Sequence, residues 1–504
     1  MFLKTFEYVR VEAGRNSGAR PAFRLRRFDR RILLIPLMVG CSHALPNING
    51  APSAPPVRDE PWRAPSGVVP PEPARAATSA ALRDSVARGP LVLGQVVDMA
   101  LRNNPQTQIS WAQARAGAAV YGEATAAYVP TLDASANVVR SQTTSQLGSS
   151  ERSTITPTAN LSYLLFDFGG RSGTIAAARF AAIALDLTHN ATLQNVALQA
   201  QAAYFTYQAQ SGLVTAARLT LAEADTNLAS AQQRNRAGVA TIADVLQAEV
   251  LVAQAQLDLE TAEGNERTSR GSLAVAMGLP ANAEYVLAPV NDSLLMSLAD
   301  ARVDILIDRA LASRPDLAAV RAQIQQAQSQ VRVAKAAELP SVTLGANVGK
   351  TFSNITAFSG LNYGLTLGIQ LPIFNLARPY AVTAAEAQAD VAAARADLLR
   401  TQVGQQVYTA YYALQTAAQR ARTTDVLLAS ATRSEITARA RYRAGVGTIV
   451  DLVTAQTALG NARAQQAQSR WVWAAALAQL THDVGGGGPR GLMTGPLAPF
   501  GIGR

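Results

Sequence analysis

The sequence predicts an α+β protein in which one structural unit is written twice, with long antiparallel coiled-coil helices and two β-strands per unit. The first observation is a repeated turn: residues 236–246 (RAGVATIADVL) and 443–453 (RAGVGTIVDLV) are identical at seven of eleven positions. The second is the pair of long helical patterns, residues 174–235 and 381–442, that precede these turns without a proline. The third is a change to period-two alternation upstream of each long helix.

Each turn has the chemistry of a connection between two helices. Gly238 can adopt the left-handed conformation that ends a helix, and Thr241 can cap the next helix. Asp244 then falls at the third helical position, where the free N–H groups and the helix dipole stabilise a carboxylate. The second copy has Gly445, Thr448 and Asp451 at the same places. Two such copies about 207 residues apart indicate an internal duplication.

The duplication extends outward from the turns. An Ala-Leu pair, a proline and a second proline recur at an offset of 210, with Pro105 matching Pro315 and Pro130 matching Pro340. Tyr204 matches Tyr411 at an offset of 207. We therefore expect each unit to contain a helix, two strands, a long helix, a turn and another helix.

The N-terminal segment has the pattern of a secretory leader. Residues 1–40 carry nine Lys or Arg residues, so most of the net charge of +10 lies there and a nucleic-acid surface is poorly supported. A short apolar run then precedes Cys41, the only cysteine. Met38 to Ser42 resembles a bacterial lipoprotein cleavage box, which makes Cys41 a candidate lipidation site; a plain signal peptide is the alternative.

The chain divides into five segments. They are a leader (1–40), a Pro-rich linker (41–90), a first repeat (91–298), a second repeat (299–484) and a Gly-rich tail (485–504). In the first repeat we expect one helix over 91–128. A strand follows from Leu132, then a polar Ser/Thr loop, and a second strand from Leu161 to Phe166.

The second repeat contains the clearest strand. Apolar residues alternate with polar or small ones from Leu361 to Leu371, a pattern typical of a membrane β-barrel strand. Helices of about 62 residues at roughly 1.5 Å per residue would extend on the order of 90 Å, three times the ~30 Å hydrocarbon core of a bilayer. No apolar run of 18 residues occurs in them, so we expect them to stand in water.

The number of strands predicts the assembly. A closed, water-filled barrel needs more than about eight strands, and an open sheet edge in lipid is not viable. Four strands per chain therefore favour three copies around a shared twelve-stranded barrel, with a matching three-fold tube of helices.

These features resemble the TolC-type outer-membrane channel-tunnel family over residues ~91–484. The most specific residues are the paired turns, 238–244 and 442–451, supported by the strand-to-helix corners 165–171 and 371–374. The resemblance implies a homotrimer that combines an outer-membrane β-barrel with a periplasmic α-barrel. It also implies a periplasmic adaptor (membrane fusion) protein as partner and an inner-membrane pump, either a proton-driven RND-type pump or an ABC transporter.

The resemblance also implies roles for residues of the turns. Asp451 matches an acidic position at the constricted entrance and Tyr442 a position that holds the tip closed, with Asp244 as a further entrance candidate. The adaptor-docking positions are Gly238, Val239, Thr241, Gly445, Val446 and Thr448. Gly447 and Thr454 depart from the pattern, since some members carry a basic residue and a second acid there.

The function expected from the resemblance is a passive export duct for small molecules in a tripartite efflux system, anchored in the outer membrane by its barrel and by lipid. The alternative is the outer-membrane component of type I protein secretion, and a remote alternative is a structural coiled-coil envelope protein. The three histidines are scattered without metal-ligand spacing, and no Walker loop, nucleophile elbow or dinucleotide fingerprint occurs. We expect no enzyme activity, no metal and no cofactor.

Overall fold

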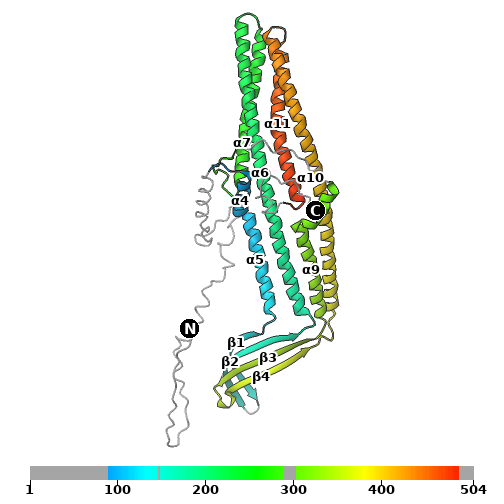
Figure 1. Cartoon of the computed structure of the whole chain (residues 1–504). Coiled ribbons are helices and arrows are strands. Elements are labelled where there is room, and N and C mark those ends of the chain that lie inside the picture. The colour runs from blue at the N-terminus through cyan, green and yellow to red at the C-terminus, as the bar shows by residue number, and fades with distance from the viewer. Residues whose placement is uncertain (1–88, 146–147, 289–301, 487–504) are drawn as a thin grey trace, which may run out of the picture. The chain divides into compact units, whose positions relative to one another are not determined.

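The computed structural model describes residues 89–145, 148–288 and 302–486 (Figure 1). The expected leader, Cys41, nearly all of the linker and most of the tail lie outside the described residues.

Eight α-helices are described, four in each repeat. The first repeat contains α4 (Leu93–Asn103), α5 (Pro105–Ala126), α6 (Gly170–Arg236) and α7 (Ile242–Ala276). The second contains α8 (Val303–Ser313), α9 (Pro315–Ala336), α10 (Ala377–Arg443) and α11 (Ile449–Asp483). Both α6 and α10 have 67 residues, and both α7 and α11 have 35, so the equivalent helices begin and end 207 residues apart. None of the described helices is both long and apolar enough to cross a membrane.

The helix expected over 91–128 is two helices, so that expectation is wrong. Asn104 separates them: its extended backbone ends α4, and its side chain accepts a hydrogen bond from the Gln106 N–H. Pro105 is the first residue of α5. The cause is proline, which lacks an N–H and disfavours helical backbone in the residue before it. Arg314 and Pro315 separate α8 from α9 in the same way.

The strands form one antiparallel sheet in the order β1-β2-β3-β4. They are β1 (Thr131–Ser145), β2 (Gly148–Phe166), β3 (Ser341–Ser353) and β4 (Gly360–Gln370). The polar loop expected between the first two strands is mostly strand, because the Ser/Thr-rich residues of β1 and β2 pair with each other up to Ser145 and Gly148. The sheet leaves two unlike free edges, β1 and β4.

The alternation in β4 produces one open apolar face. Leu361, Tyr363, Leu365, Leu367 and Ile369 are 63 to 82% exposed. Successive residues of a strand point to opposite faces, so these five side chains share one face of the sheet.

Each strand-to-helix corner is fixed by an arginine at an equivalent place. The Arg171 guanidinium donates to the carbonyl oxygens of Leu164 (2.8 Å) and Ala127 (3.2 Å). The Arg378 guanidinium donates to the carbonyl oxygen of Ala337. Arg171 and Arg378 lie in the first turns of α6 and α10, so both corners tie a long helix to the end of the preceding shorter one.

The helices form a layer with a definite order. Towards the turns, α6 contacts α7 on one side and α11 on the other, and α11 contacts α10. Towards the sheet, α6 contacts α5 and α9, and α9 contacts α10. Consequently α5 and α7 lie at one edge of the layer and α10 at the opposite edge (Figure 1). These edges continue the two edges of the sheet, because α5 leads into β1 and β4 leads into α10.

The main apolar core lies where α4, α6, α7 and α11 meet. Tyr204 and Phe205 of α6 are buried there, together with Leu273 and Met277 at the end of α7 and Trp473 of α11. Because α4 and α7 belong to the first repeat and α11 to the second, this core joins the two repeats.

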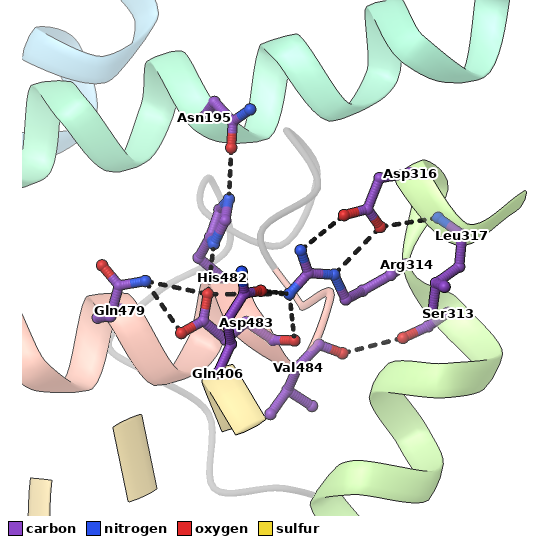
Figure 2. A network of polar contacts seen from close by, with 10 residues as sticks. All are labelled: Asn195, Ser313, Arg314, Asp316, Leu317, Gln406, Gln479, His482, Asp483 and Val484. Atoms are coloured by element: carbon purple, nitrogen blue, oxygen red, sulfur yellow. Dashed lines mark hydrogen bonds and ion pairs between the residues drawn. The ribbon is translucent and has the colours of Figure 1, made fainter. Parts of the chain in front are cut away.

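A polar network joins α6, α10 and α11 to the junction between α8 and α9 (Figure 2). The buried Arg314 guanidinium pairs with the Asp316 carboxylate at 2.6 Å and donates to the Gln406 side chain at 2.8 Å. It also donates to the backbone carbonyl of Asp483 at 3.3 Å. His482 continues the network to α6: its Nε2 lies 2.8 Å from Asn195 Oδ1, and its Nδ1 lies 2.9 Å from Asp483 Oδ1.

Candidate functional site

The two helix turns have the same backbone construction. Gly238 has a φ of 76°, and its N–H donates to the Asn235 carbonyl at 2.9 Å. The next N–H, of Val239, donates back to the Arg234 carbonyl at 2.9 Å. These two bonds define a Schellman motif, in which a glycine in the left-handed region ends the helix.

The second turn repeats this geometry. Gly445 also has a φ of 76°, with its N–H bonded to Tyr442 and the Val446 N–H bonded to Arg441. The prediction of left-handed glycine caps is confirmed at both turns.

Each turn then starts the next helix with a capping box. The Asp244 N–H donates to Thr241 Oγ1 at 3.3 Å, and the Thr241 N–H donates to the Asp244 carboxylate at 2.9 Å. In the second turn, both reciprocal bonds between Thr448 and Asp451 are 3.1 Å. The predicted caps are therefore present, and all four side chains satisfy backbone groups that a helix start leaves open.

The cap determines the ionisation of Asp451. Hydrogen bonds from Thr448, backbone and side chain, lower the pKa of the Asp451 carboxyl, and the Arg441 guanidinium adds to the effect. Asp451 is exposed, so within one chain it is an ionised carboxylate that faces water.

Tyr442 links the two turns. It is only 5% exposed and packs on Ile449 and Leu452, while its ring lies 4.8 Å from the Arg234 guanidinium carbon of α6. Arg234 also donates to the Arg443 carbonyl at 3.0 Å. Burial raises the pKa of the Tyr442 hydroxyl, and the Asp244 carboxylate adds to this while Arg234 opposes it. Among the described residues the hydroxyl has no hydrogen-bond partner.

The outer faces of the turns are apolar and open. Val239 is 63% and Val446 68% exposed, and a Cβ added to Gly238 or Gly445 would meet nothing within 4 Å. Gly447 differs, because a Cβ there would lie 3.0 Å from the Cβ of Arg441. The first turn carries Ala240 at that position, so the two turns are not interchangeable.

An ion pair missed by the sequence reasoning ties the two hairpins together farther from the turns. The Arg463 guanidinium of α11 donates two hydrogen bonds to the Glu223 carboxylate of α6, at 2.8 and 2.9 Å. The 240 residues between them leave no local signal in the sequence. Within the described ranges, no group of His, Cys, Asp or Glu residues is arranged to hold a metal ion.

A family model described as "Outer membrane efflux protein" matches residues 96–279 and 306–486, which together make up most of the chain. The chain belongs to the outer membrane efflux protein family. The two matched segments correspond to the two repeats, and the gap between them contains the undescribed residues 289–301.

Several known proteins are similar to large parts of the chain. Protein CyaE of Bordetella pertussis is 29% identical over 73% of this chain and 78% of its own length. The pyoverdine export outer membrane protein OpmQ of Pseudomonas putida is 30% identical over 54% of this chain and 57% of its own. The fold is also similar to the crystal structure of the Campylobacter jejuni CmeC outer membrane channel, with a TM-score of 0.72. The superposition covers 79% of this chain and 86% of the CmeC chain, and the two sequences are 19% identical.

Family membership confirms three expectations. The fold is that of the TolC-like channels, the protein is an outer-membrane protein, and its function is that of an efflux duct.

Proposed function

We propose that three copies of this efflux protein form a continuous duct, passive and open to small molecules, from a periplasmic adaptor and an inner-membrane pump to the cell exterior. The observation that carries the proposal is the pair of unlike free edges, α7 with α5 and β1 on one side and α10 with β4 on the other. Unlike edges associate head to tail, and such contacts generate rings when the rotation closes.

The sheet supports a barrel shared by three chains. Its open apolar face on β4 suits contact with lipid, and four strands are too few to enclose a water-filled channel. Three chains supply twelve strands and leave no edge in the hydrocarbon region.

The two turns are the proposed site of adaptor docking and of the entrance. Gly238, Val239, Gly445 and Val446 form the open apolar surface for the adaptor. Asp451 and Tyr442, with Asp244, are the proposed entrance residues. Thr241 and Thr448 contribute to docking by fixing the turn, since their side chains cap the following helices.

Cargo of low molecular weight is supported by similarity to OpmQ, which is named for pyoverdine export. Lipidation of Cys41 remains a proposal from the sequence of the leader.

Two measurements test the proposal together. Detergent-purified protein should have the mass of a trimer by light scattering. Expression in a bacterial host lacking its own efflux duct, together with an RND-type pump and its adaptor, should lower the accumulation of a fluorescent efflux substrate. A purified species that is only monomeric, or a trimer that never restores efflux while a secreted protein accumulates outside the cell, contradicts the small-molecule duct.

A further inference from the structure

A lysine lies on the apolar face of the sheet. Cross-strand partners in an antiparallel sheet point to the same side, so the pairing of Lys350 with Leu361 places Lys350 among the apolar side chains of β4. Phe352 follows on the same face, and both Lys350 and Phe352 are exposed. Phe352 is paired with Ile155 of β2, and Ile155 with Val138 of β1. An apolar row therefore crosses three strands just beyond Lys350, on the side away from the helices.

The charge of Lys350 is not balanced on this face. Of the described strand residues that point to the same side of the sheet, three are charged, namely Arg140, Glu151 and Lys350. Arg140 Nε donates to the Glu151 carboxylate at 2.6 Å, so these two charges neutralise each other. Lys350 forms no ion pair with any residue that the structure describes, and its Nζ lies 5.1 Å from the centre of the Phe352 ring.

The position of Lys350 along β3 corresponds to the edge of a hydrocarbon layer. A tilted membrane strand crosses that layer in about 9–11 residues. Counted from Val342, the first apolar residue of this face on β3, such a length ends near Phe352. Lys350 lies two residues short of Phe352, a distance of about 7 Å along the strand. Its long side chain extends towards Phe352, as basic side chains rooted in hydrocarbon do to reach the polar boundary.

We infer that Lys350 binds the phosphate group of a phosphorylated lipid, whose acyl chains pack on the apolar face of the sheet. In the proposed duct the helices extend into the periplasm, so the end of the sheet away from them lies in the outer leaflet, and Lys350 with it. Basic side chains at this depth meet the anionic head groups of lipids. This inference rests on the proposed barrel and adds a lipid ligand to it.

The neighbours of Lys350 suit a lipid rather than a soluble anion. Leu361 is 68% and Tyr363 is 82% exposed, and both point to the same side as Lys350. They offer an apolar surface to acyl chains. A free phosphate would gain only the ammonium group, because the adjacent Arg140 is already held by Glu151.

Binding of diphosphorylated lipid A to the full-length protein, purified in a maltoside detergent that contains no phosphate, tests the inference. Native mass spectrometry should detect lipid A on the wild type. Lys350→Met should weaken binding about tenfold or more, as expected for loss of a hydrogen bond to a charged group. Lys350→Arg should retain binding, because it keeps the charge. The dephosphorylated form of the lipid should bind the wild type as weakly as lipid A binds Lys350→Met, a comparison that needs no variant.

Arg152→Gln is the matched control. Arg152 lies at the same end of the sheet, but it alternates with Ser153 along β2 and so points to the opposite face. Its guanidinium carbon lies 4.9 Å from the centre of the Phe358 ring. This variant also removes one positive charge, and it should bind lipid A as the wild type does.

Lys350→Met also separates lipid binding from folding. A charge on the lipid face of a barrel strand opposes insertion, so the variant should insert into vesicles of phosphatidylcholine at least as well as the wild type. Added lipid A should raise the melting temperature of the wild type in detergent and leave that of the variant unchanged.

Equal binding of lipid A by the wild type and Lys350→Met overturns the inference and leaves the proposed barrel intact. The same conclusion follows if inorganic phosphate displaces lipid A or raises the melting temperature of the wild type as much, since Lys350 would then bind a free anion. A protein that is only monomeric by light scattering overturns both the barrel and the lipid site.

Discussion

The Arg463 guanidinium of α11 and the Glu223 carboxylate of α6 form a bidentate ion pair, with N–O distances of 2.8 and 2.9 Å and about three quarters of each side chain removed from solvent. Removing one partner leaves a poorly solvated charge without its counter-charge. We expect Arg463→Gln or Glu223→Gln to destabilise the contact between the hairpins by about 1.5–3 kcal/mol, the range for hydrogen bonds to charged groups. Chemical denaturation should show this loss, and the double variant should recover part of it. Arg218→Gln is the control, because its pair with Glu263 is more exposed and should contribute less. Equal effects of both variants would contradict this account.

Arg314 is the centre of the polar network in Figure 2, and it should be essential for stability. Arg314→Leu leaves Asp316 and Gln406 without their partner, and removing one member of a buried pair costs about 3–5 kcal/mol. Burial acts to raise the pKa of Asp316, but the hydrogen bonds and charge of Arg314 outweigh it and lower the pKa. Because the pKa of Asp316 is lower in the folded protein than its ordinary value of 3.8, the ionised carboxylate stabilises the fold at pH values above 3.8. This stabilisation is lost as the pH falls through the lowered pKa of the folded state. The difference in melting temperature between wild type and variant should therefore shrink in acid, and a difference independent of pH would argue against an ionic role.

Gly445 should matter for export more than for folding. A side chain at its φ of 76° costs roughly 1–2 kcal/mol, while the space around its Cβ is open. We expect Gly445→Asp to accumulate as a trimer but to lose export, since it places a charge on the proposed docking surface. Gly404→Ala is the control: this glycine lies inside α10 in open space, so the change should leave export intact. Loss of the Gly445→Asp protein from the membrane would make the turn a stability element instead.

Asp451 should respond to pH in a way that separates its two roles. Thr448 lowers the pKa of the carboxyl within one chain, so a residue that only caps its helix titrates below pH 3.8. Three carboxylates facing one another at an entrance raise each other's pKa. Planar-bilayer conductance should then show cation preference lost at a pH above 3.8, and Asp451→Asn should abolish that preference. Asp244→Asn, the equivalent cap in the first turn, should change the preference less. An unchanged preference in Asp451→Asn would limit this residue to capping.

Tyr442→Phe isolates the hydroxyl group from the ring. The ring packs under Arg234 and on Ile449, whereas the hydroxyl has no partner among the residues that the structure describes. The variant should therefore retain the melting temperature of wild type. Resting conductance should rise if the hydroxyl holds neighbouring helices together in the trimer. Tyr442→Ala, which removes the ring as well, should lower the melting temperature. Unchanged conductance in the Phe variant would exclude the hydroxyl from closure.

The turns and long helices were predictable because their signals are local. Gly238, Thr241 and Asp244 occupy fixed positions of a capping motif, and their recurrence 207 residues later strengthened the prediction. The break before Pro105 was missed, although a proline after an asparagine indicates one. The ends of the polar strands were missed because Ser and Thr pair well in sheets without an apolar alternation to reveal them.

The contacts between repeats were not predictable. In the sequence, Arg463 and Glu223 are charged residues of long helices that contain many other charged residues, so neither stands out. Only the packing of α11 on α6 brings them together. The same holds for Arg234, whose contact with Tyr442 depends on where two helices end in space.

The unpaired edges of β1 and β4 determine how such a protein can enter its membrane. Each open backbone N–H or C=O in hydrocarbon costs several kcal/mol, so a single chain of the proposed trimer cannot insert its sheet and wait for partners. Closure of the barrel and entry into the bilayer must then be a single event. The rate of insertion in vesicles should consequently depend on the concentration of the chain to a power greater than one, which makes the biogenesis of this duct sensitive to its own expression level.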